Sequence, residues 1–367
     1  MESLFDLISP KIKSTDWKWQ FSDYPEEKNG LKVFSCFACG GGSTMGYKLA
    51  GCEVLGCVEI DPKMNEIYVQ NHHPKYNYCM DIRDFNSLQN ESIPEELFDL
   101  DILDGSPPCT TFSIAGDREE TWGKMKKFKE GQKEQTLDDL SFVFIETVKK
   151  LNPRVVIMEN VEGLLLGEAF SYVQKIYSSF TDAGYFVHHW LLKGEQMGVP
   201  QTRHRVFFVA CRSDLMIDPS WLDMSFNYEP ITYGEIKEGK TFPMKGLSIF
   251  YDIAKQAIDS DICIADTRVR LGGKKSAFQC MYIRDNIVVP TIRTRADLID
   301  MNNLEWLSTE SIRNSQTFPI DYDFGTFARS TVNYVCGMSV PPIMIKRIVT
   351  RLIEQGVFDY AKSMRKM

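Results

Sequence analysis

The sequence of 367 residues lacks several features that mark whole classes of protein. It has no apolar run near the roughly 18 residues that a membrane-spanning helix needs. Its first stretch, Met1–Gln20, has no apolar core of the kind found in signal peptides. Its ten cysteines are scattered and form no short secreted framework, so we expect reduced thiols. These absences predict a cytoplasmic protein with no membrane partner and no disulfide scaffold.

The sequence also has fewer basic than acidic residues, 42 Lys and Arg against 50 Asp and Glu. Its formal net charge is −8, which argues against a general binder of polyanions. Residues 266–295 depart from this average, with seven basic side chains against two acidic ones. The bases are Arg268, Arg270, Lys274, Lys275, Arg284, Arg293 and Arg295. Such a segment is usually a solvated face, and it becomes a candidate for phosphate contact only if other signals indicate a nucleic-acid partner.

Strand and helix patterns alternate through the first 210 residues. Apolar runs typical of buried strands occupy 31–37, 53–59, 98–104, 155–161, 185–192 and 206–210. Helical patterns lie between them, at about 43–50, 62–71, 137–151 and 168–183. This order predicts an α/β fold with a Rossmann-like, doubly wound, mostly parallel sheet. Residues 213–300 have no clear helical period and predict a second, smaller domain, and helices are predicted again at 307–318 and 340–354.

A glycine-rich turn follows the first predicted strand. The pattern Gly40-x-Gly42-x-x-x-Gly46 precedes a helix, and Glu59 ends the next strand 19 positions after Gly40. In such folds the turn and the acid together bind nucleoside ligands, with the acid on the ribose hydroxyls. The spacing differs from the G-x-G-x-x-G of dinucleotide sites, which argues against NAD or FAD. The pair Cys36 and Cys39 encloses Phe-Ala and no proline, so we expect no thioredoxin-like role.

The predicted strand 98–104 leads into the stretch Asp104–Ser113, which contains Cys109. Ligands of open α/β sheets bind at the carboxyl ends of the strands, and two prolines before Cys109 stiffen this turn. Cys109 is therefore placed for chemistry, although a buried structural thiol is the competing interpretation. Glu159 ends another predicted strand at the same edge. Residues 114–136 form a long polar loop of the kind that often serves as a functional lid.

These stretches, in this order, resemble the DNA (cytosine-5) methyltransferases of bacterial or phage type, over about residues 31–212 and 288–350. The resemblance is carried by Phe37–Gly42, Glu59, Asp81-Ile82, Pro108-Cys109, Leu140, Glu159-Asn160-Val161, Gln201–Arg205, 307–319 and Gly337–Pro341. The sequence departs from the family pattern at three positions. Cys39 stands in place of a glycine, Thr110 in place of Gln and Met338 in place of Asn.

The resemblance implies S-adenosyl-L-methionine as cofactor, S-adenosyl-L-homocysteine as its product, and methyl transfer to carbon 5 of a flipped-out cytosine in duplex DNA. Cys109 would form a covalent adduct at carbon 6, assisted by Glu159, Arg203 and Arg205. The implied cofactor contacts are Phe37, Gly40, Gly42, Glu59, Ile60, Asp81, Ile82, Pro108, Leu140 and Ser339. The implied DNA contacts are Arg268, Arg270, Lys274, Lys275 and Thr291. No metal site is implied.

The resemblance also implies a division of the chain and a set of partners. The expected parts are an N-terminal arm (1–30), a catalytic cofactor-binding domain (31–212), a target recognition domain (213–318) and a return to the catalytic domain (319–367). Double-stranded DNA is the expected partner, over which the loop 114–136 would close. A cognate restriction endonuclease acting on the same site is a further expected partner. We expect a monomer in a bacterial nucleoid or phage-infected cell.

Three other interpretations stay open. The segment Ser106-Pro107-Pro108 matches three of the four positions of the motif used by enzymes that methylate exocyclic amines, although Cys109 replaces its aromatic residue. A tRNA cytosine-5 methyltransferase of the same family is the second. The third is a catalytically inactive DNA-binding regulator, which would require a damaged Cys109, Glu159 or glycine turn. Of these, only the turn departs from the pattern.

Overall fold

The computed structural model describes residues 11–108, 140–244, 248–274, 280–295, 297–326 and 328–359. The chain divides into two compact units. The sheet unit comprises Ser22–Lys193, His204–Phe226 and Met344–Met367. The second unit comprises Met1–Phe21, Gly194–Arg203 and Asn227–Ile343. These changes of unit differ from the division predicted at 31, 213 and 319, which stays a prediction. Among the described residues, no helix is long and apolar enough to cross a membrane.

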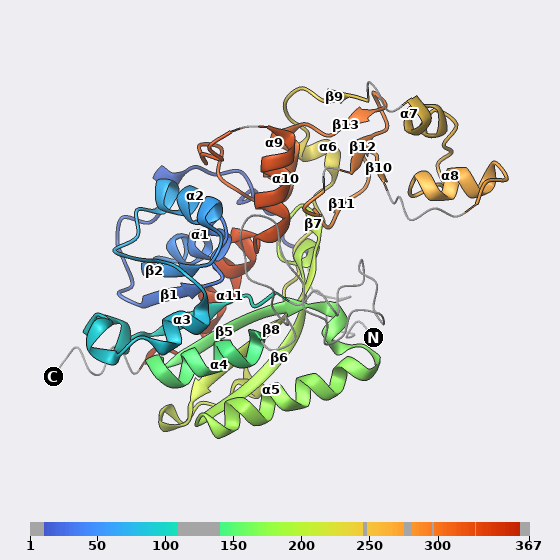
Figure 1. Ribbon diagram of the computed structural model, residues 1–367. Helices are drawn as coiled ribbons and strands as arrows, with labels where there is room; N and C mark the ends of the chain where they lie inside the picture. The colour runs from blue at the N-terminus through green and yellow to red at the C-terminus, as the bar shows by residue number, and fades with distance from the viewer. Residues whose placement is uncertain are drawn as a thin grey trace. The chain divides into compact units, whose positions relative to one another are not determined.

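A seven-stranded sheet forms the centre of the sheet unit (Figure 1). Its strands, in spatial order, are β3 (Tyr76–Cys79), β2 (Glu53–Glu59), β1 (Lys32–Cys36), β4 (Ile102–Gly105), β5 (Val155–Val161), β8 (His204–Arg212) and β6 (Tyr185–Lys193). The neighbouring pairs from β3 to β5 are parallel, whereas β8 is antiparallel to both β5 and β6. The predicted α/β class with a mostly parallel sheet is therefore confirmed.

Among the residues that the structure describes, six α-helices belong wholly or largely to this unit. They are α1 (Gly42–Leu49), α2 (Pro62–His72), α3 (Ile82–Ser87), α4 (Leu140–Leu151), α5 (Phe170–Asp182) and α11 (Pro342–Glu354). The start of α2 shows why its sequence forms a helix. The Asp61 carboxylate accepts the backbone N–H of Lys63 at 2.9 Å, and Pro62 occupies the first helical position, where a missing N–H costs nothing.

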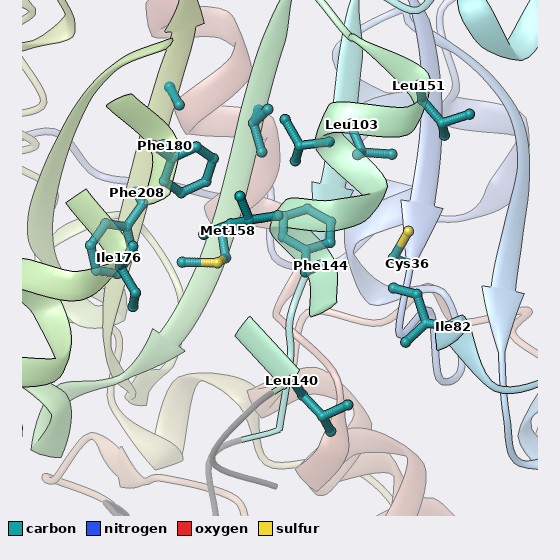
Figure 2. Close-up of a cluster of buried hydrophobic side chains, with 14 of the residues drawn as sticks. Cys36, Ile82, Leu103, Leu140, Phe144, Leu151, Met158, Ile176, Phe180 and Phe208 are labelled. Carbon is teal, nitrogen blue, oxygen red and sulfur yellow. The ribbon is translucent and has the colours of Figure 1, made fainter. Parts of the chain in front are cut away.

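One face of the sheet carries an extended apolar cluster. Cys36, Leu103, Met158 and Phe208 come to this cluster from four strands, and Phe144 of α4 and Ile176 of α5 join it from the helices (Figure 2). Further members include Phe34, Ile82, Phe85, Leu140, Leu151 and Phe180, contributed by β1 and by α3, α4 and α5. Each fully buried large apolar side chain contributes about 1.5–3 kcal/mol to folding. Because successive side chains of a strand point to opposite faces, the residues between these face the other side of the sheet, where α1 lies.

The second unit contains smaller elements (Figure 1). Its four-stranded sheet has the order β10 (Met281–Ile283), β12 (Leu298–Asp300), β13 (Glu305–Trp306) and β9 (Phe242–Pro243). A two-stranded sheet pairs β11 (Val289–Pro290) with β7 (Gln201–Thr202). The helices are α6 (Tyr233–Ile236), α7 (Ser248–Ala254), α8 (Ile264–Arg270), α9 (Thr309–Ser315) and α10 (Arg329–Met338). The helices α6, α7 and α8 are too short to produce a clear helical period, which explains why residues 213–300 show none.

Candidate active site

The turn between β1 and α1 has an unusual backbone. Phe37 has φ 58°, Cys39 has φ 47° and Gly41 has φ 82°, so three of five consecutive residues adopt the left-handed conformation. The Cys39 N–H donates to Glu59 Oε2 at 2.7 Å, and the Gly41 N–H donates to the Ala38 carbonyl at 2.8 Å. These bonds hold the turn tightly against the end of β2.

Gly41 has no room for a side chain. An added Cβ would lie 2.0 Å from Nε2 of His72, the last residue of α2. This imidazole is buried, and its Nε2 lies 3.1 Å from the Gly40 carbonyl oxygen. In a neutral ring, Nε2 must carry the proton to donate this hydrogen bond. Burial lowers the pKa of His72 to about 3, so the ring stays neutral. The glycine turn is thus packed directly on a neutral histidine.

Glu59 lies at the carboxyl end of β2 and is 7% exposed. Its Oε1 accepts the Asp61 N–H at 2.8 Å, while Oε2 accepts the Cys39 N–H. Burial raises the pKa of Glu59, and these backbone donors oppose the shift. Each carboxylate oxygen keeps a second lone pair for a ligand hydroxyl. Ile60 follows directly and is partly buried.

The first turn of α1 has no side-chain cap, because Gly41 occupies the N-cap position. Its backbone N–H groups and the positive end of the helix dipole suit a ligand carboxylate. Glu59 suits a ribose diol at the neighbouring strand end. A nucleoside that carries an amino acid therefore fits the donor and acceptor set of this edge, as the expected S-adenosylmethionine requires.

Other predicted cofactor contacts lie at the same edge of the sheet. Asp81 caps α3, because its Oδ1 accepts the Arg83 N–H at 2.8 Å, and the next residue, Ile82, is buried. Leu140 begins α4 and is 3% exposed, and Pro108 is partly buried. Cys109, Thr110 and the predicted lid 114–136 lie outside the described residues.

Glu159 and Arg205 form an ion pair across neighbouring strands. Glu159 of β5 pairs with Phe207 of β8, and Arg205 lies two residues further along β8, so both side chains leave the same face of the sheet. Arg205 Nε lies 2.8 Å from Glu159 Oε1, and both side chains are largely buried. The Arg205 guanidinium also donates to the His204 carbonyl at 2.8 Å. The arginine is thus fixed beside the carboxylate.

A buried acid without an assigned role belongs to the same face. Asp104 of β4 is directly opposite Ser35 on β1 and Ile157 on β5, two residues before Glu159. Ser35 Oγ donates to Asp104 Oδ2 at 2.7 Å, and the Tyr47 hydroxyl of α1 donates to Oδ1 at 3.0 Å. Burial raises the pKa of Asp104 to about 7. The sequence marked Asp104 only as a strand end, since nothing in the sequence shows that hydroxyl donors converge on it.

The predicted site residues of the second unit include Arg203, Thr291 and Ser339. Arg203 is buried, and its guanidinium donates to the Gly337 carbonyl at 3.4 Å. Ser339 ends α10, and its buried hydroxyl has no hydrogen-bond partner among the described residues, which leaves it available to a ligand. The Thr291 hydroxyl donates to the Thr202 carbonyl at 2.8 Å beside the β11–β7 pair. This bond gives Thr291 a structural role in addition to the predicted DNA contact.

The predicted DNA-contacting bases differ in their surroundings. Arg268 and Lys274 are exposed. Arg270 Nη2 lies 2.8 Å from Asp261 Oδ2, so this side chain is held within the second unit. Lys275 lies outside the described residues. Arg270 therefore has a structural partner, Asp261, whereas Arg268 and Lys274 are exposed.

Comparison with known proteins gives a consistent result. The model of the family described as C-5 cytosine-specific DNA methylase matches residues 31–241. The type II methyltransferase M.FnuDI of Fusobacterium nucleatum is 31% identical over 51% of this chain and 48% of its own length. The type II methyltransferase M.NgoPII of Neisseria gonorrhoeae is 30% identical over 53% and 51%. The chain spans about half the length of these curated relatives.

Solved structures share the fold over a larger part of the chain. A putative DNA modification methyltransferase encoded within an Escherichia coli prophage superposes with a TM-score of 0.64 and 18% identity, covering 89% of this chain and 99% of that one. A DNMT2 variant of Spodoptera frugiperda gives a TM-score of 0.62 and 16% identity, covering 88% and 100%. At these identities the likeness concerns the fold alone.

Proposed function

Because the chain belongs to the C-5 cytosine-specific DNA methylase family, we propose that it transfers a methyl group to carbon 5 of cytosine within a specific duplex DNA sequence. The observation that carries the proposal is the Glu159–Arg205 ion pair of 2.8 Å. The pair lies on the sheet face that also carries Asp104. Asp104 belongs to β4, the strand that leads to Cys109. A carboxyl, a guanidinium and a thiol are the three groups that activation of a cytosine ring needs.

Carbon 5 of cytosine is a weak nucleophile until a sulfur adds to carbon 6. In the proposed reaction the Cys109 thiolate forms the sulfur–carbon bond, and negative charge develops toward ring nitrogen 3. Glu159 holds a proton at that nitrogen, and Arg205 binds oxygen 2 of the base while it fixes the carboxyl. Carbon 5 then takes the methyl group, a base or water removes the carbon 5 proton, and the Cys109 sulfur leaves.

S-adenosylmethionine would supply the electrophilic methyl group. Glu59 would hold its ribose hydroxyls, and the uncapped first turn of α1 would hold its carboxylate. Phe37, Ile82 and Leu140 would surround its base and sulfonium with apolar surface. Arg203 would support the segment that carries Arg205 and would act as a positioning residue.

The target base must leave the helix before Cys109 can reach carbon 6. Extrusion of a base costs a few kcal/mol, which contacts to the flanking duplex must offset. We propose that the basic segment 266–295 supplies such contacts and that the loop 114–136 closes over the DNA. In a type II context, a restriction endonuclease for the same site would be the natural partner.

The full-length protein, incubated with labelled S-adenosylmethionine and random duplex, tests the proposal. We expect label in DNA and, after sequencing of the modified positions, 5-methylcytosine in one sequence context. Label on an exocyclic amine, or label accepted by tRNA and not by duplex, would refute the proposed substrate.

Two variants test the roles of the residues. Cys109→Ser should lose turnover while it keeps duplex affinity, because only the nucleophile changes. Glu159→Gln keeps the shape but removes the proton donor, so we expect a fall in kcat of about 10²-fold or more with little change in the KM for cofactor. A Cys109→Ser protein that no longer binds duplex would instead indicate a structural thiol.

A further inference from the structure

The helix α1 contacts its neighbours through buried hydroxyl groups. Ser43, Thr44 and Tyr47 are 7%, 1% and 0% exposed. The hydroxyl oxygens of Thr44 and Tyr68 lie 2.9 Å apart, which joins α1 to α2. The Tyr47 hydroxyl donates to Asp104, which joins α1 to β4. Because a satisfied network of buried polar groups fixes one arrangement of the elements it joins, hydrogen bonds as well as packing set the position of α1.

Asp104 is the residue at which α1 and β1 meet β4. Its Oδ2 accepts the Ser35 hydroxyl at 2.7 Å, and its Oδ1 accepts the Tyr47 hydroxyl at 3.0 Å. Burial raises the pKa of Asp104, and hydrogen bonds from these two hydroxyls and from Ser43 oppose the shift. Ser43 lies in the first turn of α1, so the acid holds the start of this helix. Asp104 is 4% exposed and can act on a ligand only through these neighbours.

The chain that follows Asp104 is joined to the same region a second time. Ser106 Oγ donates to the Phe37 carbonyl at 3.4 Å, and Phe37 begins the turn between β1 and α1. Ser106 lies two residues after Asp104, in the segment that leads to Cys109. Two such contacts restrict both the separation and the rotation of the turn relative to this segment. A change at Asp104 should therefore move the start of α1.

We propose that Asp104 is a positioning residue, which holds the first turn of α1 in a fixed place relative to the segment that leads to Cys109. The N–H groups of that turn would bind the carboxylate of S-adenosylmethionine, and a misplacement on the order of 1 Å is enough to impair binding and reaction. The proposal rests on the cofactor of the proposed function and deepens it, because it names a residue that sets where the cofactor lies.

Two ligands separate this role from general stability. S-adenosylhomocysteine carries the amino-acid carboxylate, whereas 5′-methylthioadenosine has the same adenosine and sulfur but no amino acid. Calorimetric titration of the full-length protein measures the first ligand, and displacement of the first measures the second. Asp104→Val removes both acceptor oxygens. In this variant S-adenosylhomocysteine should bind about 10-fold more weakly, and 5′-methylthioadenosine should bind within about twofold of wild type.

Two milder variants sharpen the test. Tyr47→Phe removes one hydroxyl, so we expect the same selective loss at a smaller, several-fold size, and this variant keeps the test decisive if Asp104→Val does not fold. Asp104→Asn keeps an acceptor and a donor for the surrounding hydroxyls, so it should retain the wild-type affinity for S-adenosylhomocysteine. Urea denaturation shows which variants are folded under the conditions of the titration.

Asp101→Val is the matched control. Asp101 is 6% exposed and accepts the Lys32 N–H at 2.8 Å. It lies directly before β4, at the opposite end of the strand from the segment that leads to Cys109. Its replacement should lower the stability of the protein but leave the ratio of the two ligand affinities unchanged.

The outcomes distinguish this proposal from the proposed function. Equal weakening of both ligands in Asp104→Val and Tyr47→Phe would indicate a purely structural acid and refute the proposal. Unchanged binding of both ligands in these variants, or the same selective loss in Asp101→Val, would also refute it. Wild-type protein that binds neither ligand would refute the proposed cofactor, and the role of Asp104 with it. Wild-type protein that binds S-adenosylhomocysteine but methylates no duplex would refute the proposed methyl transfer alone.

Discussion

Cys39 stands where the family pattern has glycine, and its backbone still follows the path that a glycine would take, with φ 47°. A residue with a side chain costs on the order of 1 kcal/mol in this conformation. The buried hydrogen bond of 2.7 Å from its N–H to Glu59 offsets that cost, since a carboxylate is a strong acceptor. Cys39 is therefore held in the left-handed conformation by its bond to Glu59.

Gly41→Ala should strongly destabilise the protein. The change places a Cβ 2.0 Å from His72 Nε2 at φ 82°, so it adds a steric overlap to backbone strain. Gly272→Ala is the matched control, since Gly272 has φ 84° with nothing within 4 Å. In urea denaturation we expect a loss of about 1 kcal/mol for Gly272→Ala and at least about 2 kcal/mol more for Gly41→Ala. Equal losses of unfolding free energy in the two variants would show that the His72 side chain moves aside without an energetic cost.

Asp104→Asn should change how stability depends on pH. The folded-state pKa of Asp104 is raised from 3.8 to about 7 by burial, so the folded protein binds this proton more tightly than the unfolded chain does. The resulting stability is complete below about pH 4 and is lost as the pH rises toward 7, by at most about 1.4 kcal/mol per pH unit. An amide keeps an acceptor and a donor for the Ser35 and Tyr47 hydroxyls but does not ionise.

Thermal denaturation of both proteins between pH 5 and 8 measures this effect. The stability of wild type relative to Asp104→Asn should fall with increasing pH, because all other titrating groups are shared. A difference that stays constant across the range would contradict a proton held by Asp104. Because this acid lies on the face of Glu159, the pH profile of methyl transfer should shift with it.

At the scale of elements, β4 and α4 pack closely because Gly105 of β4 has no side chain where Phe144 of α4 lies. A Cβ on Gly105 would lie 2.4 Å from the Phe144 ring, which is fully buried (Figure 2). Gly105→Ala should therefore cost about 1–3 kcal/mol through overpacking. Adding Phe144→Leu should recover part of this loss, and a double-mutant cycle in urea denaturation measures the coupling. Additive losses would place the strain elsewhere.

The elements that the sequence revealed are those with long, regular patterns. The strands 53–59 and 155–161 have the predicted bounds, and the helix predicted at 137–151 is present as α4, with Leu140, Phe144, Val148 and Leu151 buried. The strand β3 and the helices α3 and α10 were missed. In β3 only four residues alternate, and α10 carries polar residues and a glycine that the sequence indicated as a motif rather than as a helix.

The candidate site was predictable to the extent that its residues end strands. Glu59 ends β2 as expected, whereas Glu159 lies two residues before the end of β5. The partners of these acids were not all predictable. The bond from Cys39 to Glu59 and the hydroxyl groups around Asp104 depend on register and on helix placement, which a single sequence does not encode locally. The tether of Arg270 to Asp261 was hidden for the same reason.

At the scale of the whole molecule, each compact unit is assembled from three separate segments of the chain. The sheet unit includes most of α11, whose Ile345, Ile348, Val349 and Leu352 are at most 1% exposed. Arg351 of α11 also pairs with Asp223 at 3.1 Å within this unit. The family resemblance implies a return of the chain to the catalytic domain after residue 319, which stays a prediction, and residues 344–354 add the buried face of α11 to the sheet unit.

A fragment of residues 1–226 should therefore fail to fold, although it contains Cys109, Glu159 and Arg205. Loss of α11 leaves its apolar binding surface open to water, at a cost of about 1.5–3 kcal/mol for each large side chain removed. The control is a chain in which a long flexible linker replaces residues 227–343, since it keeps every segment of the sheet unit. We expect soluble, cooperatively melting protein from the control only. Equal solubility of the two proteins would contradict a structural role for α11.

The late position of α11 has a consequence for synthesis. A ribosome exposes the glycine turn and the segment of Cys109 long before it releases residues 344–354, so a growing polypeptide carries the reactive groups without the finished sheet that orders them. The proposed methyl transfer would then require that residues 344–354 have already left the ribosome. Products that stop before residue 344 would leave the surface that binds α11 uncovered, and we expect cellular proteases to degrade them faster than the full chain.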